Sequence, residues 1–309
     1  MRNKDFPLVS IGCITYNHEK YIRDCIEGFL MQKTNFPFEI IIHDDASTDK
    51  TPEIIKEYAK KYPKLFVPIL QEENQYSKGV DPYPTFVFPQ VRGKYIAICE
   101  GDDYWTDPLK LQKQVDFLKN HSGFMLTVSG FVENKNGKEK TIIKSDDPSY
   151  INETEQGFEF DLSSRGWLTK SLTLVFRKNQ EIFKQFEKYK YGRDVHLNYH
   201  LLKKGKGYYF KESFGVYNIH EGGIFSLKSK RKKIIDHFFL YQELYEENKD
   251  EFLRRKYFII LQKVLRLKLY RDEELRNQYN FMQTFKLAWQ IQHSGKDKLR
   301  IIKSVIQGI

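Results

Sequence analysis

The feature that most constrains the fold is a regular alternation of strand-like and helix-like patterns over the first 120 residues. Short apolar runs of strand length occur at residues 8–14, 39–43, 65–70 and 95–99. Amphipathic helical patterns lie between and after them, at residues 19–32, from Thr51-Pro52 and after Asp107-Pro108. This alternation predicts an α/β fold whose central sheet is mostly parallel and covered on both faces.

The pattern is less regular after about Gly130. We expect a hairpin turn at residues 134–137, a strand at 171–176 and a helix at 191–203. After Gly222-Gly223 the composition changes to long, basic, amphipathic helices. The sequence therefore predicts two domains, an α/β domain at residues 1–225 and a helical extension at 226–309.

The composition is that of a globular chain, because 40% of the 309 residues are hydrophobic. No apolar run approaches the roughly 18 residues of a membrane-spanning helix, and the basic start precedes no signal-peptide pattern. Cys13, Cys25 and Cys99 lie far apart in the sequence and form no metal-type cluster. This cysteine usage favours a reducing compartment, so we expect a cytoplasmic protein.

The excess of basic residues belongs to the tail. Residues 228–309 hold 19 of the 51 lysines and arginines but only 10 of the 41 acidic residues. The tail interleaves these cations with Phe258, Leu261, Leu265 and Leu269. Helices of this kind can lie on an anionic bilayer, so peripheral contact with the inner face of the membrane is one hypothesis. A solvated helical face, packing on the first domain and a homodimer contact are the alternatives.

Acidic residues follow two of the expected strands. The run Glu100-Gly101-Asp102-Asp103 follows residues 95–99, and Asp44-Asp45 follows residues 39–43. Ligands of parallel sheets bind beyond the carboxyl ends of the strands. Adjacent carboxylates there can hold Mg²⁺ or Mn²⁺ and leave coordination positions to substrate phosphates. The alternatives are a loop that caps the next helix and an ordinary turn.

Together, three segments resemble family 2 glycosyltransferases of the GT-A fold in order, spacing and strand context. They are residues 7–17 leading to Tyr16-Asn17, the run 44–49 with Ala46 in place of a glycine, and residues 93–103 ending in Asp102-Asp103. The match is good over about residues 7–120 and looser to about 225. The resemblance implies inverting, metal-dependent transfer of a sugar from a nucleotide-sugar donor, a UDP-sugar by default. It also implies a saccharide or lipid-linked acceptor and a role in surface polysaccharide synthesis.

The resemblance also implies roles for single residues on the donor side. Tyr16 would pack on the base, Asp45 would bond the base edge, Asp102 would contact the ribose or sugar, and Asp103 would ligate Mn²⁺ or Mg²⁺. The family's Arg-Asn pair before the metal strand is absent from this sequence, and Lys78 or Arg92 could supply the missing positive charge.

The second half of the chain holds the remaining candidates. Asp194 begins an expected helix where the family places its catalytic base, and an N-cap is the alternative role. His220 is expected near the diphosphate or the metal, or as a hydrogen-bonded loop residue. Trp167 and Trp105 are expected to stack on acceptor sugar rings. His196 and His200 lack the intervening glutamate of a His-Glu-x-x-His zinc motif, so we expect no zinc there.

Three other classes of protein share some of these features. A nucleotidyltransferase should carry a glycine-rich basic loop after its first strand, where this chain has Thr15-Tyr16-Asn17-His18. A processive synthase should carry membrane spans and a Gln-x-x-Arg-Trp motif, and neither is present. A nucleotide-sugar or nucleic-acid binding protein without transferase activity would use the basic tail. We expect no nucleic-acid partner, because no known nucleic-acid motif occurs.

Overall fold

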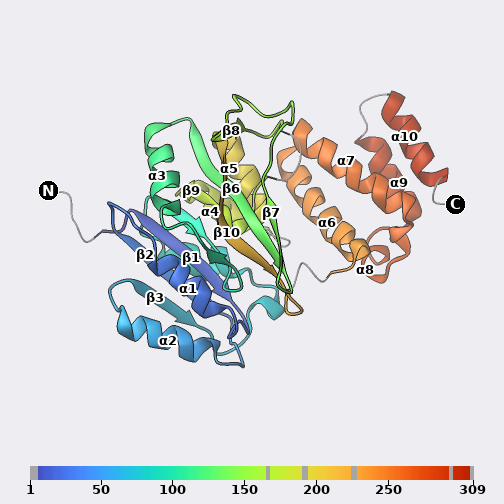
Figure 1. The fold of residues 1–309 in the computed structure, drawn as a ribbon. Helices are drawn as coiled ribbons and strands as arrows, with labels where there is room; N and C mark the ends of the chain where they lie inside the picture. The colour runs from blue at the N-terminus through green and yellow to red at the C-terminus, as the bar shows by residue number, and fades with distance from the viewer. Residues whose placement is uncertain (1–5, 165–167, 190–193, 224–227, 292–294, 307–309) are drawn as a thin grey trace. The chain divides into compact units, whose positions relative to one another are not determined.

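The computed structural model describes residues 6–164, 168–189, 194–223, 228–291 and 295–306. The chain divides into two compact units, unit 1 at residues 1–222 and unit 2 at residues 223–309 (Figure 1). Unit 1 is an α/β structure, whereas the described part of unit 2 is helical.

The core of unit 1 is a sheet with the strand order β3-β2-β1-β4-β9-β6-β10-β5 (Figure 1). Its strands are β1 Val9–Thr15, β2 Phe38–Asp44, β3 Phe66–Leu70, β4 Tyr95–Ile98, β5 Tyr104–Trp105, β6 Phe124–Lys135, β9 Val175–Arg177 and β10 Lys206–Ile219. Strand β7, Lys138–Ile142, pairs with β6, and β8, Gly157–Phe160, pairs with β10. Strands β3, β2, β1 and β4 are parallel, as are β6 and β10, while β9 is antiparallel between β4 and β6.

The first parallel strands are buried on both faces, which explains why their sequences are continuous apolar runs. Helices cover them as α1 Ile22–Leu30, α2 Thr51–Lys61 and α3 Lys110–Asn120. In α1 the side chains of Ile22, Cys25, Ile26 and Phe29 share one buried face. These elements lie within a few residues of the expected ranges, and the predicted α/β class with a mostly parallel sheet is confirmed.

The second half of unit 1 adds α4 Gln180–Phe186 and α5 Asp194–Lys204. The expected hairpin turn joins β6 to β7, with Asn136 and Gly137 at positive φ. Strand β10, which the sequence pattern did not predict, runs parallel to β6 for most of its length. Its carboxyl end brings Asn218 to the same sheet edge as the acidic runs after β2 and β4.

Unit 2 contains α6 Lys230–Asn248, α7 Glu251–Arg266, α8 Glu273–Arg276, α9 Phe281–Gln290 and α10 Gly295–Ile306. The tail residues Phe258, Leu261, Leu265 and Leu269, which one hypothesis placed on a membrane surface, are each at most 4% exposed. They form the core of the helical unit, because helix-on-helix packing uses the same apolar spacing as a membrane-facing helix. Of the helices that the structure describes, none is both long and apolar enough to cross a bilayer.

Candidate functional site

The carboxyl edge of the parallel sheet is tightly closed around Gly101. In the register of β1 and β2, Thr15 lies beside Asp44. The Gly101 N–H donates to the carbonyl oxygen of Ile14 at 2.9 Å, which fixes the turn after β4 against β1. A Cβ atom on residue 101 would lie 2.6 Å from the Thr15 hydroxyl oxygen, so only glycine allows this approach. The run Glu100–Asp103 is therefore held at the edge where ligands of such sheets bind.

Three side chains that can bind a metal converge at this edge. They are His18 from the loop after β1, Asp102 from the turn after β4, and His220 directly after β10. The Nε2 atom of His220 lies 3.0 Å from an Asp102 carboxylate oxygen, and the Nε2 atom of His18 lies 3.8 Å from the same oxygen. One potential ligand atom from each residue lies within 4.8 Å of the other two. We call these residues the histidine–aspartate cluster.

Tyr21 and the loop after β1 support this cluster. The Tyr21 ring packs against the His220 imidazole with a centroid distance of 4.5 Å. The backbone N–H of His18 donates to the Thr51 hydroxyl at 2.9 Å, which anchors the loop. The buried Nδ1 atom of His18 has no hydrogen-bond partner among the residues that the structure describes. Because buried polar atoms are normally bonded, this nitrogen is suited to a ligand.

The surroundings of the cluster favour an ionised Asp102 beside a neutral His18. Burial raises the pKa of Asp102, but the His220 hydrogen bond and the potentials of His18 and His220 outweigh it, so the net pKa is lowered. Burial lowers the pKa of His18, against the opposing effect of Asp102. A carboxylate and neutral imidazoles are the protonation states that metal binding requires.

Asp103 and Asp102 have different surroundings. The Asp103 side chain is 1% exposed and accepts the Asn218 backbone N–H at 2.9 Å. Burial, together with the charges of Asp102 and Glu100, raises its pKa well above the ordinary value. The structure therefore places Asp102 with His220, whereas the sequence interpretation gave the metal to Asp103 and the sugar contact to Asp102.

A second charged group surrounds Asp103, and sequence reasoning missed its cation. Lys170 is mostly buried, and its Nζ atom lies 3.3 Å from the centre of the Tyr217 ring. Burial lowers the pKa of Lys170, while the charges of Asp103, Glu100 and Asp194 act in the opposite direction. Asp194 is exposed and is the first residue of α5. It lies close enough to Glu100 for its charge to contribute to the raised pKa of Glu100.

The carboxylates of the acidic turn after β2 accept hydrogen bonds from their own turn and from residues 75–76. The Asp44 carboxylate accepts two hydrogen bonds from Ser47, one from its backbone N–H at 3.0 Å and one from its side-chain hydroxyl at 2.5 Å. Asp45 is buried and accepts the backbone N–H groups of Gln75 and Tyr76 at 2.8 and 3.0 Å. Ala46 has φ of 60°, the left-handed conformation that explains a glycine at this position in the family turn. This turn thus fixes residues 75–76 beside the sheet edge.

The other expected donor residues lie near the same edge. Tyr16 follows β1 directly, and its ring is exposed, as stacking on a base would require. Lys78 lies in the short helical turn Tyr76–Lys78 and forms an ion pair with Glu73. Arg92 is bonded to the buried Glu39 at the opposite edge of the sheet, so of these two candidate cations Lys78 is the one near the carboxyl edge.

Trp105 is a core residue and not an exposed platform for a sugar. Its side chain is 1% exposed and packs against the Phe29 ring with a centroid distance of 4.8 Å. Its indole N–H donates to the Leu172 carbonyl oxygen at 2.7 Å. The short strand β5 turns the ring inward because it pairs with β10. The expectation that Trp105 contacts the acceptor is wrong. Trp167 lies outside the described residues.

The donor set of the histidine–aspartate cluster fits a divalent cation. Two imidazoles and one carboxylate suit a borderline ion such as Mn²⁺ better than Mg²⁺, which strongly prefers oxygen ligands. Three protein ligands leave coordination positions for substrate oxygens. The sequence analysis named Thr15-Tyr16-Asn17-His18 only to exclude a glycine-rich loop and did not single out His18, although a histidine beside the first strand end was the available signal.

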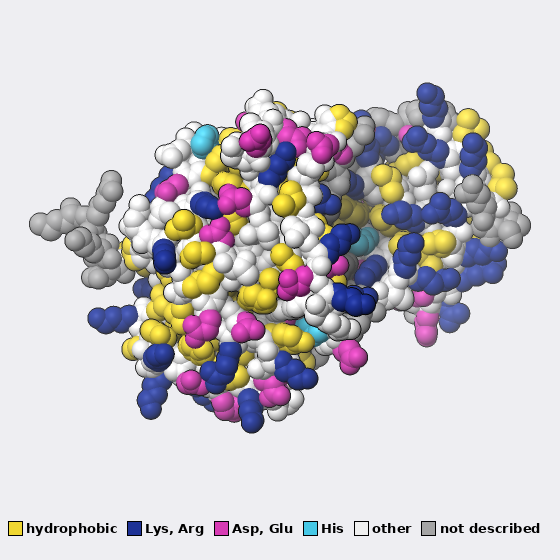
Figure 2. Space-filling model, in the orientation of Figure 1, with side chains coloured by type: hydrophobic (Ala, Val, Ile, Leu, Met, Phe, Trp, Pro, Cys, Tyr) yellow, Lys and Arg dark blue, Asp and Glu magenta, His cyan; other side chains and the backbone are white. Residues whose placement is uncertain are grey.

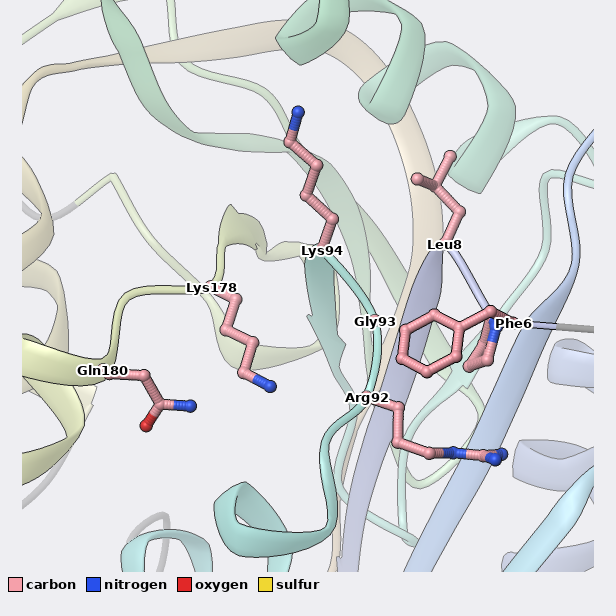
Figure 3. Close-up of a pocket in the computed structure, with 8 residues that line it drawn as sticks. Phe6, Leu8, Arg92, Gly93, Lys94, Lys178 and Gln180 are labelled. Atoms are coloured by element: carbon pink, nitrogen blue, oxygen red, sulfur yellow. The ribbon is translucent and has the colours of Figure 1, made fainter. Parts of the chain in front are cut away.

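A separate hollow of about 440 Å³ lies at the amino edge of the sheet. It is lined by Phe6, Pro7, Leu8, Arg92, Gly93, Lys94, Lys178 and Gln180 (Figure 3). The Nζ atom of Lys178 donates to the Val91 carbonyl oxygen, and Arg92 pairs with Glu39, so two of its cations already have protein partners. The seven residues of β1 separate this hollow from the carboxyl edge by about 20 Å. It is not part of the histidine–aspartate cluster.

Comparison with known proteins identifies the family of the chain. A family model described as Glycosyl transferase family 2 matches residues 10–178, more than half of the chain. An uncharacterized protein of Mycobacterium tuberculosis is 57% identical over 113 residues, which are 37% of this chain and 32% of that protein. The putative teichuronic acid biosynthesis glycosyltransferase TuaG of Bacillus subtilis is 27% identical over 241 residues, 77% of this chain and 88% of that protein.

The chain spans about a third of the length of the mycobacterial relatives it matches. Among solved structures, the crystal structure of S. aureus TarS 1–349 in complex with UDP-GlcNAc superimposes with a TM-score of 0.55. The two chains are 18% identical, and the match covers 96% of this chain and 89% of that chain. At this identity the likeness concerns the fold, and it confirms the GT-A type that the sequence predicted.

Proposed function

Because the chain belongs to glycosyl transferase family 2, we propose that it transfers a sugar from a nucleotide-sugar donor to a saccharide or lipid-linked acceptor with inversion. The observation that carries this proposal is the convergence of His18, Asp102 and His220 at the carboxyl edge of the sheet. We assign the donor as a UDP-sugar, in line with the UDP-GlcNAc complex of the TarS structure.

Donor binding is assigned to the loops at the carboxyl edge. Tyr16 presents an exposed ring for the base. Asp45 fixes the backbone at Gln75 and Tyr76, and so positions Lys78 two residues further on. The Lys78 ammonium then exchanges its exposed partner Glu73 for a donor phosphate, an exchange that costs little because exposed ion pairs are weak.

His18, Asp102 and His220 would hold Mn²⁺ in preference to Mg²⁺. When bound, the ion would neutralise the charge that develops on the departing nucleoside diphosphate. Asp103 is assigned a positioning role, because it fixes Asn218, whose side chain in turn donates to the Asp102 carbonyl oxygen at 2.6 Å. These contacts keep the carboxyl end of β10, and hence His220, against the turn after β4.

Asp194 is assigned as the general base that removes the proton from the acceptor hydroxyl. Its position at the exposed start of α5, electrostatically linked to Glu100 and Lys170, supports this role. The Lys170 ammonium would offset the negative charge of Asp103, Glu100 and Asp194.

The acceptor belongs, in this proposal, to a surface polysaccharide, as the name of the TuaG relative suggests for that protein. We place the protein in the cytoplasm with peripheral contact at the inner face of the membrane. Three free, buried cysteines support a reducing compartment. The membrane contact is consistent with a lipid-linked acceptor.

The test is donor turnover by the full chain with a panel of nucleotide sugars, with Mn²⁺ and with a chelator. We expect UDP release that requires the metal, and we expect His220→Ala and His18→Ala to lose metal-dependent turnover. His121→Ala is the matched control, because His121 is an exposed histidine at the end of α3. Undiminished turnover in chelator, or equal loss in the control, would contradict the metal assignment.

A binding protein without transferase activity is distinguished in the same assay. It would show a thermal shift with UDP-sugars but no UDP release under any metal condition. Asp194→Asn separates the base from the donor site, because we expect the donor-induced thermal shift to remain while transfer falls. A loss of both would remove Asp194 from the role of base.

A further inference from the structure

Two helices of unit 2 carry apolar side chains on the face that points away from the unit. In α9, Thr284 and Ala288 point inward, as does Ile291 just after the helix, while Met282 and Trp289 are exposed and Phe285 is half-buried. In α10, Ile301 and Ser304 point inward, while Leu299, Ile302 and Ile306 are exposed. We call the six outward residues Met282, Phe285, Trp289, Leu299, Ile302 and Ile306 the α9–α10 face.

The α9–α10 face has the same spacing in both helices. Its residues recur at i, i+3 and i+7 in each, so each helix has one apolar stripe for packing and a second for another partner. Five of its six residues, all except Phe285, have exposed fractions of 37–68%. Isolated exposed apolar residues are ordinary on protein surfaces, but repeated stripes of this kind mark interaction sites.

The two stripes adjoin each other. The Lys298 ammonium of α10 lies 5.3 Å from the centre of the Trp289 ring of α9, a cation–π contact that joins the outward sides of the helices. A hollow of about 480 Å³ opens along α9 and is lined by Met282, Gln283, Phe285, Lys286, Trp289 and Gln290. The two stripes therefore lie on adjacent helices, and the surface along α9 is hollowed.

Cations surround this surface. Lys286, Lys296, Lys298, Arg300 and Lys303 are all exposed on α9 and α10, and Asp297 is the one acidic residue in residues 275–309. Figure 2 shows lysine and arginine side chains, with hydrophobic side chains between them, over the helices of unit 2. An exposed apolar stripe flanked by lysine and arginine is the pattern of a helix that lies in a membrane interface.

We propose that the α9–α10 face docks unit 2 onto an anionic membrane surface. The apolar side chains would enter the boundary between headgroups and acyl chains, and the flanking cations would contact the anionic headgroups. This inference deepens the membrane contact proposed above, but it does not depend on transferase activity, because lipid binding is measured without a sugar donor. It also replaces the buried α7 residues, which the sequence had suggested for this role.

Charge favours a membrane over a second copy of the chain. Residues 228–309 carry nine more lysines and arginines than acidic residues. A symmetric dimer through the α9–α10 face would place its five cations against the same five of the partner, which is costly. An anionic bilayer has the opposite sign and offers an apolar layer beneath it.

The experiment is co-flotation of the full chain with vesicles of phosphatidylcholine alone and with phosphatidylglycerol added. We expect binding to the anionic vesicles that weakens as salt is raised. The triple variant Leu299→Ser, Ile302→Ser and Ile306→Ser should bind at least about ten-fold more weakly, because three apolar side chains no longer enter the bilayer. Lys286→Glu with Lys303→Glu should weaken binding to anionic vesicles by more than ten-fold, since each surface cation contributes a factor of about five.

Ile143→Ser is the matched control, because Ile143 in unit 1 and Ile302 are both isoleucines at 43% exposure. Circular dichroism and thermal unfolding establish that each variant is folded. Equal binding by the triple variant and the wild type would overturn the assignment, as would a failure of the wild type to bind anionic vesicles. Loss of a dimer in the triple variant, with no vesicle binding by the wild type, would identify a second copy as the occupant instead.

Trp289 supplies an independent readout. Brominated phospholipids quench tryptophan only within the acyl region, and Trp289 is exposed on the α9–α10 face whereas Trp105 is 1% exposed in the core. We expect the wild type to be quenched by anionic brominated vesicles, and Trp289→Phe to lose that quenching while it still binds. Persistent quenching in Trp289→Phe would show that another part of the chain enters the bilayer.

Discussion

The two acidic turns of unit 1 look alike in sequence but differ in what their carboxylates contact. After β2, Asp44 and Asp45 accept hydrogen bonds from N–H and hydroxyl groups of nearby loops. After β4, Asp102 faces the imidazoles of His18 and His220. The first turn organises backbone, whereas the second places a carboxylate beside two imidazoles.

The difference shows that the chemistry of a carboxylate pair depends on which other segments of the chain contact it. The turn after β2 is met by residues 74–76, whose backbone supplies donors. The turn after β4 is met by the end of β10, which supplies Asn218 and His220. Replacing the carboxylate that faces the imidazoles should therefore lower activity, whereas replacing a carboxylate that bonds backbone N–H groups should lower stability.

The largest effect is expected for Asp102→Asn. The amide keeps the shape of the side chain but removes the anionic ligand between two histidines, so metal-dependent donor turnover should fall on the order of 100-fold or more. Steady-state UDP release at several Mn²⁺ concentrations measures this. Asp24→Asn, on the exposed side of α1, is the control and should keep full activity. A rate for Asp102→Asn within two-fold of the wild type would remove Asp102 from the metal site.

The next effect concerns the pH dependence of stability at Glu100. Burial, and then the charge of Asp102, raises the pKa of Glu100 from 4.5 to about 7. Between these values the unfolded chain loses a proton that the folded chain keeps, so the free energy of unfolding falls as pH rises through this window. In chelator, Glu100→Gln should lack this decline and should exceed the wild type by on the order of 2 kcal/mol above pH 7. Denaturant unfolding at pH 4.5–8 measures it, and parallel curves for both proteins would refute it.

Asp45→Asn should lower stability more than activity. An asparagine has one carbonyl oxygen in place of the two carboxylate oxygens that bond Gln75 and Tyr76, so one buried N–H loses its acceptor. The expected loss is about 1–2 kcal/mol in the free energy of unfolding. Asp24→Asn again serves as the control, at under about 0.5 kcal/mol. A variant as stable as the wild type but inactive would give Asp45 a direct role in donor binding instead.

The smallest effect is a gain of stability from Ala46→Gly. The left-handed φ of 60° at Ala46 strains a side chain that glycine lacks. Glycine also has more conformational freedom in the unfolded chain, which offsets part of this gain. The net increase in the free energy of unfolding should be about 0.5–1 kcal/mol. Ala59→Gly in the last turn of α2 should have the opposite sign, a loss of up to about 1 kcal/mol. Equal losses at both positions would show that the turn after β2 relaxes in solution.

The sequence predicted the elements that depend on local pattern. The runs behind β1, β2 and β4 are apolar because both faces of these strands are buried, and that signal is present in each segment alone. Strand β10 was missed because Lys211 and Glu212 interrupt its pattern at an irregularity in the pairing with β6. Partners such as His18 and Lys170 could not be assigned, because only the folded sheet brings them beside Asp102 and Asp103.

Two errors had the same physical origin, since aromatic and apolar residues suit more than one environment. Trp105 beside an acidic turn resembled a sugar platform, but pairing of β5 with β10 turns it into the core. Phe258 and Leu261 had the spacing of a membrane-facing stripe, which is equally the spacing of a helix-packing stripe. Exposure, which a sequence does not state, decides between such alternatives.

The position of His220 has a consequence for the order in which the molecule forms. His220 and Asp102 are 118 residues apart, and their contact requires β10 to be in place beside β6. During synthesis the histidine–aspartate cluster thus cannot exist until nearly all of unit 1 has left the ribosome. Contacts of such long range form late in folding. A cation held there would slow unfolding and leave the folding rate unchanged, so it would increase the kinetic stability of the folded unit 1.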